Sequence, residues 1–145
     1  MYVGGKPDSP ASAHADWVRT DPTEAADYVA RTGVDALAVA VGSSHAMTER
    51  SATLDHALIE RLREAVPVPL VLHGSSGVPD TELRAAVRAG MVKINVGTAL
   101  NIAFAHGVRH MLERAPALTD PRKYPGPARD AVATTVHDIL TALAA

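Results

Sequence analysis

The feature that most constrains the fold is an apolar run that ends directly in a loop of small polar residues. The chain repeats it three times, as VDALAVAV-GSSH at 34–45, LVL-HGSSG at 70–77 and MVKINV-GT at 91–98. Nearly continuous apolar runs are typical of strands that are buried on both faces of a parallel sheet. The repeat therefore predicts a parallel sheet in which every strand exits into a polar loop.

Helix patterns separate these runs. Asp21 is placed to cap a helix that starts at Pro22, and Gly33 is a natural residue to end it. Leu54, Leu58 and Leu62 recur at helical spacing further along the chain. The predicted helices run from Pro22 to Gly33, from about Ser51 to Ala65, from Asp80 to Ala89, from about Thr98 to Arg114 and from roughly Pro127 to Leu143. This alternation with the strands predicts the α/β class.

The length of 145 residues limits how much of a known architecture the chain can form. A complete (β/α)₈ barrel needs about 250 residues, and an open doubly wound sheet usually has five or six strands. Either the sheet is small or the chain is part of something larger. Residues 1–21 are rich in Gly, Pro, Ser and Asp, which predicts an irregular loop before the first helix.

Composition excludes several classes of function. The net charge of −2 and the scattered Lys and Arg residues argue against a nucleic-acid or membrane-binding surface, and 3% aromatic residues argue against base stacking. The chain has no cysteine, so disulfides and thiolate metal sites are excluded. No signal-peptide layout and no apolar run of about 18 residues appear, so we expect a cytoplasmic protein.

Two histidines stand at equivalent ends of successive strands. His45 ends the first loop and His73 begins the second. The carboxyl ends of parallel strands meet at one rim, where ligands bind, and imidazole is the commonest metal ligand. The pair therefore suggests a shared metal ion. The alternative for each histidine alone is a hydrogen-bonded structural role.

The same loops are candidates for phosphate binding. Glycine lets the backbone approach an anion, and the N–H groups at a helix start attract phosphate. The candidates are Gly74, Ser75 and Ser76 in the second loop, and Asn95, Val96, Gly97 and Thr98 in the third. The alternative is that Gly and Ser only form tight turns.

The remaining histidines give weaker signals. His106 and His110 have the i, i+4 spacing of zinc-binding helices, but Gly107 stands where a metalloprotease has glutamate, so an exposed helix face is the better interpretation. The sequence reveals no partner for the histidines at 14, 56 and 137, and the aspartates at 8 and 16 are typical turn residues.

Three segments together resemble one family, the class II, metal-dependent fructose-bisphosphate aldolases and their tagatose-bisphosphate relatives. They are TDPTEAADYVARTGVDALAVAVGSSH, VPLVLHGSSGVPDTELRAAVRAGMVKINVGT and DPRKYPGPARDA, and they follow the family's order and spacing over most of the chain. YVGGKPD at 2–8 resembles the loop after a central strand in that family. The resemblance is to the second half of a (β/α)₈ barrel, from the end of about the fifth strand onward. It implies that residues 1–145 form a single partial barrel domain, with an active-site-type loop at 1–21 and the helix and strand units with the C-terminal helices at 22–145.

The resemblance implies an aldehyde-lyase that cleaves a ketose bisphosphate into dihydroxyacetone phosphate and an aldehyde. It implies Zn²⁺ held by three histidines, of which His45 and His73 are two, and a monovalent cation as a further ion. It also implies that the two loops named above bind the phosphate of dihydroxyacetone phosphate, and that Asn95 lies on the enediolate side of the site.

The chain also departs from the family. The third histidine ligand, a carboxylate metal site and the catalytic aspartate lie in an N-terminal half that these residues do not include. Pro7 stands where well-studied members have a glutamate base, which leaves Asp8 as the nearby carboxylate candidate, and Ala46 stands where the family usually has glycine.

These departures leave two other functions open. One is a binding module that holds a sugar phosphate without turnover. The other is a half-barrel that associates with itself or with a separate N-terminal half, because an open barrel exposes strand edges and apolar surface.

Overall fold

Three short parallel strands form the sheet, and they lie in chain order, β1-β2-β3. The computed structural model describes residues 18–44 and 47–144. The strands are β1 (Leu37–Val39), β2 (Leu70–Leu72) and β3 (Met91–Ile94). Leu37 pairs with Leu70, and Leu70 pairs with Met91, with a register shift just after Leu70. The predicted α/β class with about three parallel strands and flanking helices is confirmed.

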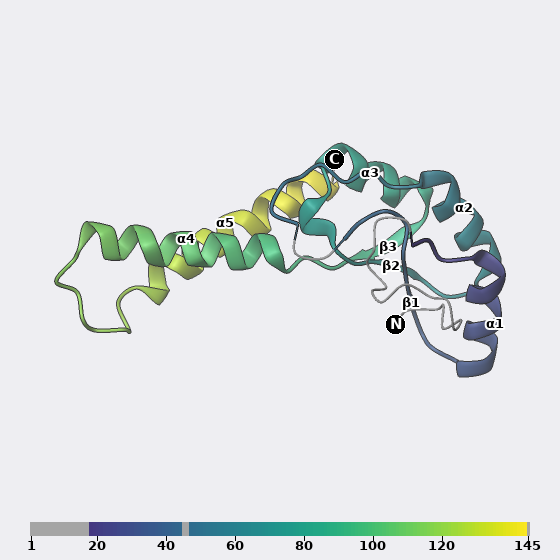
Figure 1. The fold of residues 1–145 in the computed structure, drawn as a ribbon, viewed down its shortest axis with the longest axis horizontal. Coiled ribbons are helices and arrows are strands. Elements are labelled where there is room, and N and C mark those ends of the chain that lie inside the picture. The colour runs from purple at the N-terminus through teal and green to yellow at the C-terminus, as the bar shows by residue number, and fades with distance from the viewer. Residues whose placement is uncertain (1–17, 45–46, 145) are drawn as a thin grey trace. The chain divides into compact units, whose positions relative to one another are not determined.

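Helices connect the strands on one side of the sheet. The first unit of the chain, residues 1–96, contains α1 (Pro22–Thr32), α2 (His56–Ala65), the short 3₁₀ turn η1 (Ser75–Gly77) and α3 (Asp80–Ala89). Crossovers between neighbouring parallel strands are right-handed, which puts α2 and α3 on the same face. Figure 1 shows α1, α2 and α3 following one another around the sheet.

The core lies between β2 and these helices. All three residues of β2 are buried, as are Leu58, Ile59 and Leu62 of α2 and Leu83 and Ala86 of α3. The apolar positions of each helix recur at helical spacing, so they fall on the face that packs inward.

The outer strands are less buried than β2. In β1, Leu37 and Val39 are buried but Ala38 is partly exposed, so the expectation of burial on both faces is wrong for this strand. The reason is the two-residue period of a strand, which turns Ala38 to the face opposite the core. In β3 only Met91 is buried, and Val92 is 71% exposed.

Local sequence sets most helix ends. The Asp21 carboxylate accepts hydrogen bonds from the backbone N–H groups of Thr23 (2.8 Å) and Glu24 (3.0 Å), which fixes the start of α1. Gly33 ends the helix in the left-handed conformation, with φ at 65°. The predicted start and end of α1 are therefore confirmed.

The predicted start of α2 at Ser51 is wrong. Asp55 is the N-cap residue, because its carboxylate accepts a hydrogen bond from the N–H of Leu58 at 2.8 Å. Residues 51–54 instead form an irregular segment whose backbone bonds to α3 and to the end of η1. Leu54 follows the helical spacing of Leu58 and Leu62 and is buried, but it lies outside the helix.

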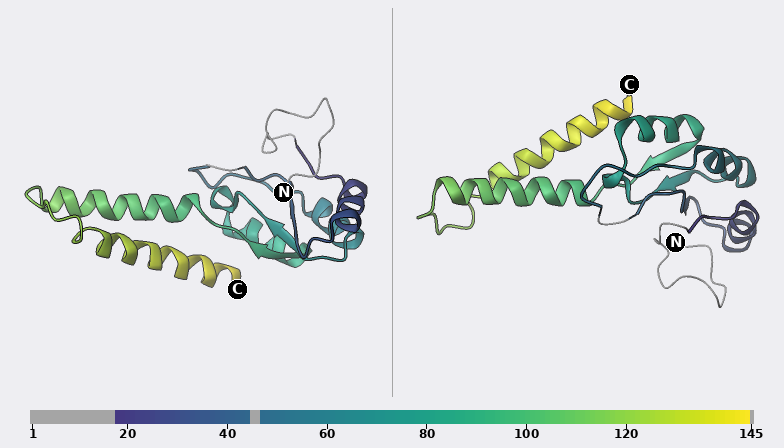
Figure 2. Two further views of the ribbon diagram at one scale, coloured as in Figure 1. Left: turned by 90° about the horizontal axis from the view of Figure 1, so that it is seen from below. Right: turned by 45° about the horizontal axis from the view of Figure 1, so that its top comes forward.

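The second unit, residues 97–145, contains two helices. They are α4 (Thr98–Arg114) and α5 (Pro125–Ala144), which lie side by side in Figure 2. The two helices approach closely at Gly107, where a Cβ atom would lie 2.6 Å from the Cα of Ala128. The bounds of α4 match the prediction, and α5 begins two residues earlier than predicted, because a proline in the first helical turn needs no N–H partner.

No helix among residues 18–44 and 47–144 is both long and apolar enough to cross a membrane. The assignment of residues 1–145 to one partial barrel domain stays a prediction.

Candidate functional site

The candidate site begins where β2 ends. Leu70, Val71 and Leu72 are buried, and His73 follows them at the carboxyl end of the strand, partly exposed. Gly74 then turns the chain in the left-handed conformation, with φ at 68°. Only a glycine adopts this conformation without strain, so the sequence His-Gly places the imidazole at the strand tip.

The loop after β2 bonds to the chain that leaves β3. The Ser75 hydroxyl donates to the carbonyl oxygen of Asn95 at 2.6 Å, and the Asn95 N–H donates to the carbonyl of Leu72 at 2.9 Å. The Asn95 side-chain amide nitrogen lies 3.3 Å from Nε2 of His73. Sequence-predicted residues from two strand ends, His73, Ser75 and Asn95, are therefore in direct contact.

These contacts restrict what each side chain can do. Ser75 is buried and its hydroxyl proton is engaged by the Asn95 carbonyl, so Ser75 would reach an anion through its backbone N–H. When Nε2 of His73 is unprotonated, the Asn95 amide donates to it. An ion bound at Nε2 would therefore displace Asn95.

The loop after β1 covers the same strand end. The Ser43 hydroxyl donates to the carbonyl oxygen of His73 at 2.5 Å. A Cβ atom on Gly74 would lie 2.5 Å from the carbonyl oxygen of Ser44. The first and second exit loops are thus packed against each other, as expected for neighbouring parallel strands.

Of the two histidines predicted to bind a metal ion, the structure describes one, His73. His45, with Ala46, lies outside the described residues, so the approach of His45 to His73 stays a prediction. No group of three or more His, Cys, Asp or Glu side chains that could hold a metal ion occurs in the described parts of the chain. Zinc takes four ligands, and His73 is the one imidazole that the described residues bring to this strand end.

The other sequence candidates fall in different places. Val96 closes the first unit, whereas Gly97 and Thr98 open the second, with Gly97 as the N-cap residue of α4. Asp8, with the other candidates at 14 and 16, lies outside the described residues. His106 and His110 are exposed on α4, as predicted.

The structure brings a carboxylate near one histidine for which the sequence revealed no partner. Nε2 of His56, at the start of α2, lies 3.4 Å from a carboxylate oxygen of Glu82 in the first turn of α3. The same Glu82 oxygen accepts a hydrogen bond from the backbone N–H of Leu54 at 2.9 Å. Since His56 and Glu82 are far apart in sequence, no local pattern indicates this contact.

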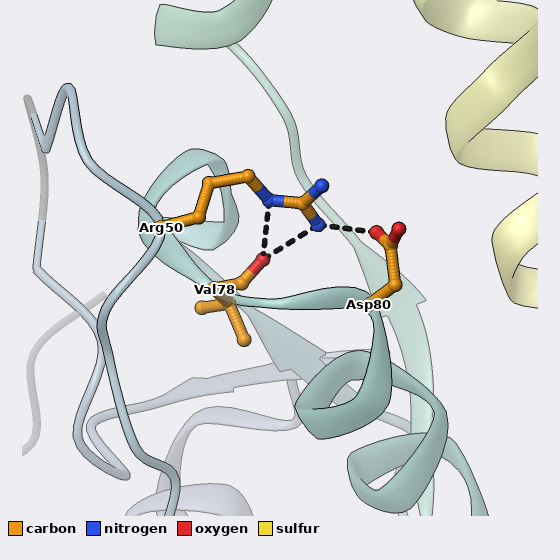
Figure 3. A network of polar contacts seen from close by, with 3 residues as sticks. All are labelled: Arg50, Val78 and Asp80. Atoms are coloured by element: carbon orange, nitrogen blue, oxygen red, sulfur yellow. Dashed lines mark hydrogen bonds and ion pairs between the residues drawn. The ribbon is translucent and has the colours of Figure 1, made fainter.

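Sequence reasoning also missed an arginine near the site. The Arg50 guanidinium donates to the carbonyl oxygen of Val78 from Nε at 3.0 Å and from Nη2 at 2.8 Å, and Nη2 also pairs with the Asp80 carboxylate. Figure 3 shows the guanidinium between these two partners. Arg50 thereby joins the segment after the first exit loop to the end of the second.

One carboxyl group away from these loops has a shifted pKa. A hydrogen bond from the Arg122 side chain, and a second from the Arg122 backbone, lower the pKa of Asp120. This pair lies in the connection between α4 and α5, with the Arg122 side chain 87% exposed and the Asp120 side chain 28% exposed, so it has a local structural role.

One hollow of about 420 Å³ lies at the opposite ends of the strands. It is bordered by residues 66–70, which lead into β2, and by Gly90, Met91 and Val92, which begin β3. Ligands in parallel α/β sheets bind at the carboxyl ends of the strands. The hollow is therefore at the wrong end to belong to the site around His73.

Comparison with known proteins gives a consistent match. The family model described as fructose-bisphosphate aldolase class-II matches residues 2–145. The D-tagatose-1,6-bisphosphate aldolase subunit GatY of Klebsiella oxytoca is 38% identical over 138 residues, which are 95% of this chain and 49% of GatY. The chain thus spans about half the length of this relative.

Solved structures agree with the family match. The YdjI aldolase from Escherichia coli K12 superposes with a TM-score of 0.69 at 35% identity, over 88% of this chain and 44% of YdjI. The fructose-bisphosphate aldolase of Campylobacter jejuni gives a TM-score of 0.71 over 86% of this chain and 45% of its own, and at 21% identity this likeness concerns the fold alone.

Proposed function

The chain belongs to the class II fructose-bisphosphate aldolase family, and we therefore propose that it forms the phosphate-binding half of an aldehyde-lyase site. The proposed reaction cleaves a ketose 1,6-bisphosphate between C3 and C4 into dihydroxyacetone phosphate and an aldehyde. One observation carries the proposal, namely the direct contact of His73, Ser75 and Asn95 at two neighbouring strand ends. It brings together residues that the resemblance assigns to metal and substrate.

The phosphate role is assigned mainly to backbone groups. The Gly74–Ser76 segment turns tightly at the strand tip, and glycine there lets the backbone approach an anion. The Ser75 hydroxyl holds the Asn95 carbonyl, which fixes this turn against the chain after β3. Asn95 and Val96 continue the site, and Gly97 and Thr98, the next residues of the chain, keep the role that the resemblance predicts.

The metal role is assigned to His73 and His45. When bound, zinc would supply a Lewis acid that polarises the substrate ketone. His73 stands at the end of a rigid strand, with its carbonyl fixed by Ser43 and its ring beside Asn95. The bond from Ser43 orients the backbone of this ligand before it binds the ion, whereas the Asn95 amide would leave Nε2 if the ion bound that nitrogen.

The remaining part of a complete site is proposed to come from a partner segment. GatY and YdjI are each about twice the length of this chain. We propose that an N-terminal half supplies the third histidine and the catalytic aspartate, either on a longer chain or as a separate polypeptide. Assembly into homo-oligomers stays a prediction.

Dihydroxyacetone phosphate is expected to perturb the loops after β2 and β3 selectively. Backbone N–H groups that approach a phosphate change their environment most, so amide shifts recorded by NMR should concentrate at 74–76 and 95–98. Inorganic phosphate is the control for the sugar part of the ligand. Shifts spread over the hollow at the start of β2 and β3, with none at 74–76, would contradict the site.

Zinc is expected to bind weakly and to require both strand-end histidines. With two protein ligands instead of the usual three or four, affinity should be poor, and the His45→Ala, His73→Ala double variant should lose it. The matched control is the His106→Ala, His110→Ala double variant, which removes two exposed imidazoles from α4. Calorimetric titration that gives equal affinity for wild type and the His45, His73 variant would refute the assignment.

A further inference from the structure

A seam of hydrogen bonds fastens the segment 50–54 to the chain that runs from η1 into α3. The Ala52 N–H donates to the carbonyl oxygen of Gly77 at 2.9 Å. The Leu54 N–H donates to the Glu82 carboxylate at 2.9 Å. At the other end of the segment, Arg50 binds the Val78 carbonyl and the Asp80 carboxylate. This seam explains why residues 51–54 are not helical, since the N–H groups of Ala52 and Leu54 bond outside the segment.

Arg50 holds the carbonyl that directly follows the 3₁₀ turn. Two of its N–H groups point at one oxygen, that of Val78, a geometry that the rigid guanidinium fork provides. The Val78 N–H in turn donates to the carbonyl of Ser75 at 3.0 Å and closes η1, and its side chain is fully buried. Val78 is therefore fixed on three sides, and Arg50 supplies one of them.

The first exit loop also covers the rest of the second. Ser43 donates to the carbonyl of His73 at one end of the loop. Near the other end, a Cβ atom on Gly77 would lie 2.4 Å from Cβ of Met47, so the Met47 side chain packs directly on this glycine. Arg50 is the last of these contacts and the one that carries a charge.

The ion pair with Asp80 contributes less to holding Arg50 in place than the hydrogen bonds to Val78 do. The side chains of Arg50 and Asp80 are 46% and 41% exposed, so water screens their attraction. The bonds to Val78 are directional and reach a backbone group, and hydrogen bonds from a charged donor are among the stronger ones. The position of Val78 thus depends on the guanidinium more than on the ion pair.

We propose that Arg50 is a positioning residue, which keeps the Gly74–Val78 loop in its 3₁₀ turn and so preforms the loop for phosphate. The inference rests on the proposed function for its final step, phosphate binding, and on the described contacts alone for the first. Arg50 acts through Val78, and it is assigned no contact with substrate.

The first arm of the test is amide hydrogen exchange of the 145-residue chain without ligand. In Arg50→Gln, the N–H groups of Val78 and Ala52 should exchange about tenfold faster or more, because both bonds depend on the seam. Arg50→Lys, which offers one compact donor, should give an intermediate rate, and Asp80→Asn should change the rate less than Arg50→Gln. The matched control is Arg31→Gln, which removes an exposed arginine paired with Asp27 within α1.

The second arm is the affinity for dihydroxyacetone phosphate, measured by NMR titration. Arg50→Gln should weaken binding about tenfold relative to wild type, and Arg31→Gln should leave it unchanged. If wild type itself shows no binding, the proposed function fails, while the exchange arm still decides whether Arg50 holds the loop.

Three results would overturn the proposal. One is unchanged exchange at Val78 and Ala52 in Arg50→Gln. Another is faster exchange spread equally over β2 and α2, which would reduce Arg50 to a general contribution to stability. The third is a loosened loop that binds dihydroxyacetone phosphate as tightly as wild type does.

Discussion

A polypeptide of these 145 residues is expected to release no measurable triose phosphate from fructose or tagatose bisphosphate, even with zinc present. By resemblance, the aldehyde-side aspartate lies outside this sequence and the enolisation glutamate is replaced by Pro7. Loss of one positioned general acid or base typically removes about 10²–10⁴-fold in rate, and loss of two together with a metal ligand compounds this. A coupled assay for triose phosphate measures it.

Restoring the missing residues should restore turnover. The experiment adds an N-terminal half taken from a relative such as GatY, either as a separate chain or by fusion. The control adds the same half to a His73→Ala chain. Turnover by the 145 residues alone, abolished by His73→Ala, would show that the chemistry requires fewer residues than we propose. If the two halves associate without turnover, the alternative of a sugar-phosphate-binding module is favoured.

Gly74→Ala is expected to lower the free energy of unfolding by about 2–5 kcal/mol. A non-glycine residue in the left-handed conformation costs about 1–2 kcal/mol, and Gly74 has φ at 68°. The added methyl group would lie 2.5 Å from the carbonyl oxygen of Ser44, and overpacking of this kind costs about 1–3 kcal/mol. Urea denaturation followed by circular dichroism measures the loss.

Gly33→Ala is the matched control for this variant. Gly33 has nearly the same backbone conformation, with φ at 65°, but a Cβ atom there meets nothing within 4 Å. Gly33→Ala should therefore lower the free energy of unfolding only by the cost of the left-handed backbone conformation, about 1–2 kcal/mol. Equal losses for the two variants would mean that the approach of the two exit loops contributes nothing to stability.

Local chemistry made much of the fold predictable. Asp21, Pro22 and Gly33 mark the bounds of α1 because each acts on its own few backbone groups. Asp80 to Ala89 and Thr98 to Arg114 were predicted with the bounds that the structure shows. The three apolar runs predicted the strands and their exits, because apolar β-strand runs and glycine turns are short-range signals.

Contacts between distant segments account for what the sequence did not predict. Leu54 continues the helical spacing of Leu58 and Leu62 toward the N-terminus. The N–H groups of Ala52 and Leu54 nevertheless bond to Gly77 and Glu82, which no local pattern reveals. The pairing of Arg50 with Val78 likewise joins segments that are 28 residues apart. For the candidate site, the positions of His73, Ser75 and Asn95 at strand ends were enough to predict that they lie close together. The hydrogen bond from the Ser75 hydroxyl to the Asn95 carbonyl could not be predicted from the sequence.

The order of the strands has a consequence for how the sheet is made during translation. Because β1, β2 and β3 are neighbours in chain order, each new strand that leaves the ribosome finds its hydrogen-bonding partner already synthesised. Domains fold from the N-terminus at synthesis rates of about 5–20 residues per second, so the β1–β2 pair has a second or more to form before β3 emerges. The sheet can therefore grow by addition of one strand at a time.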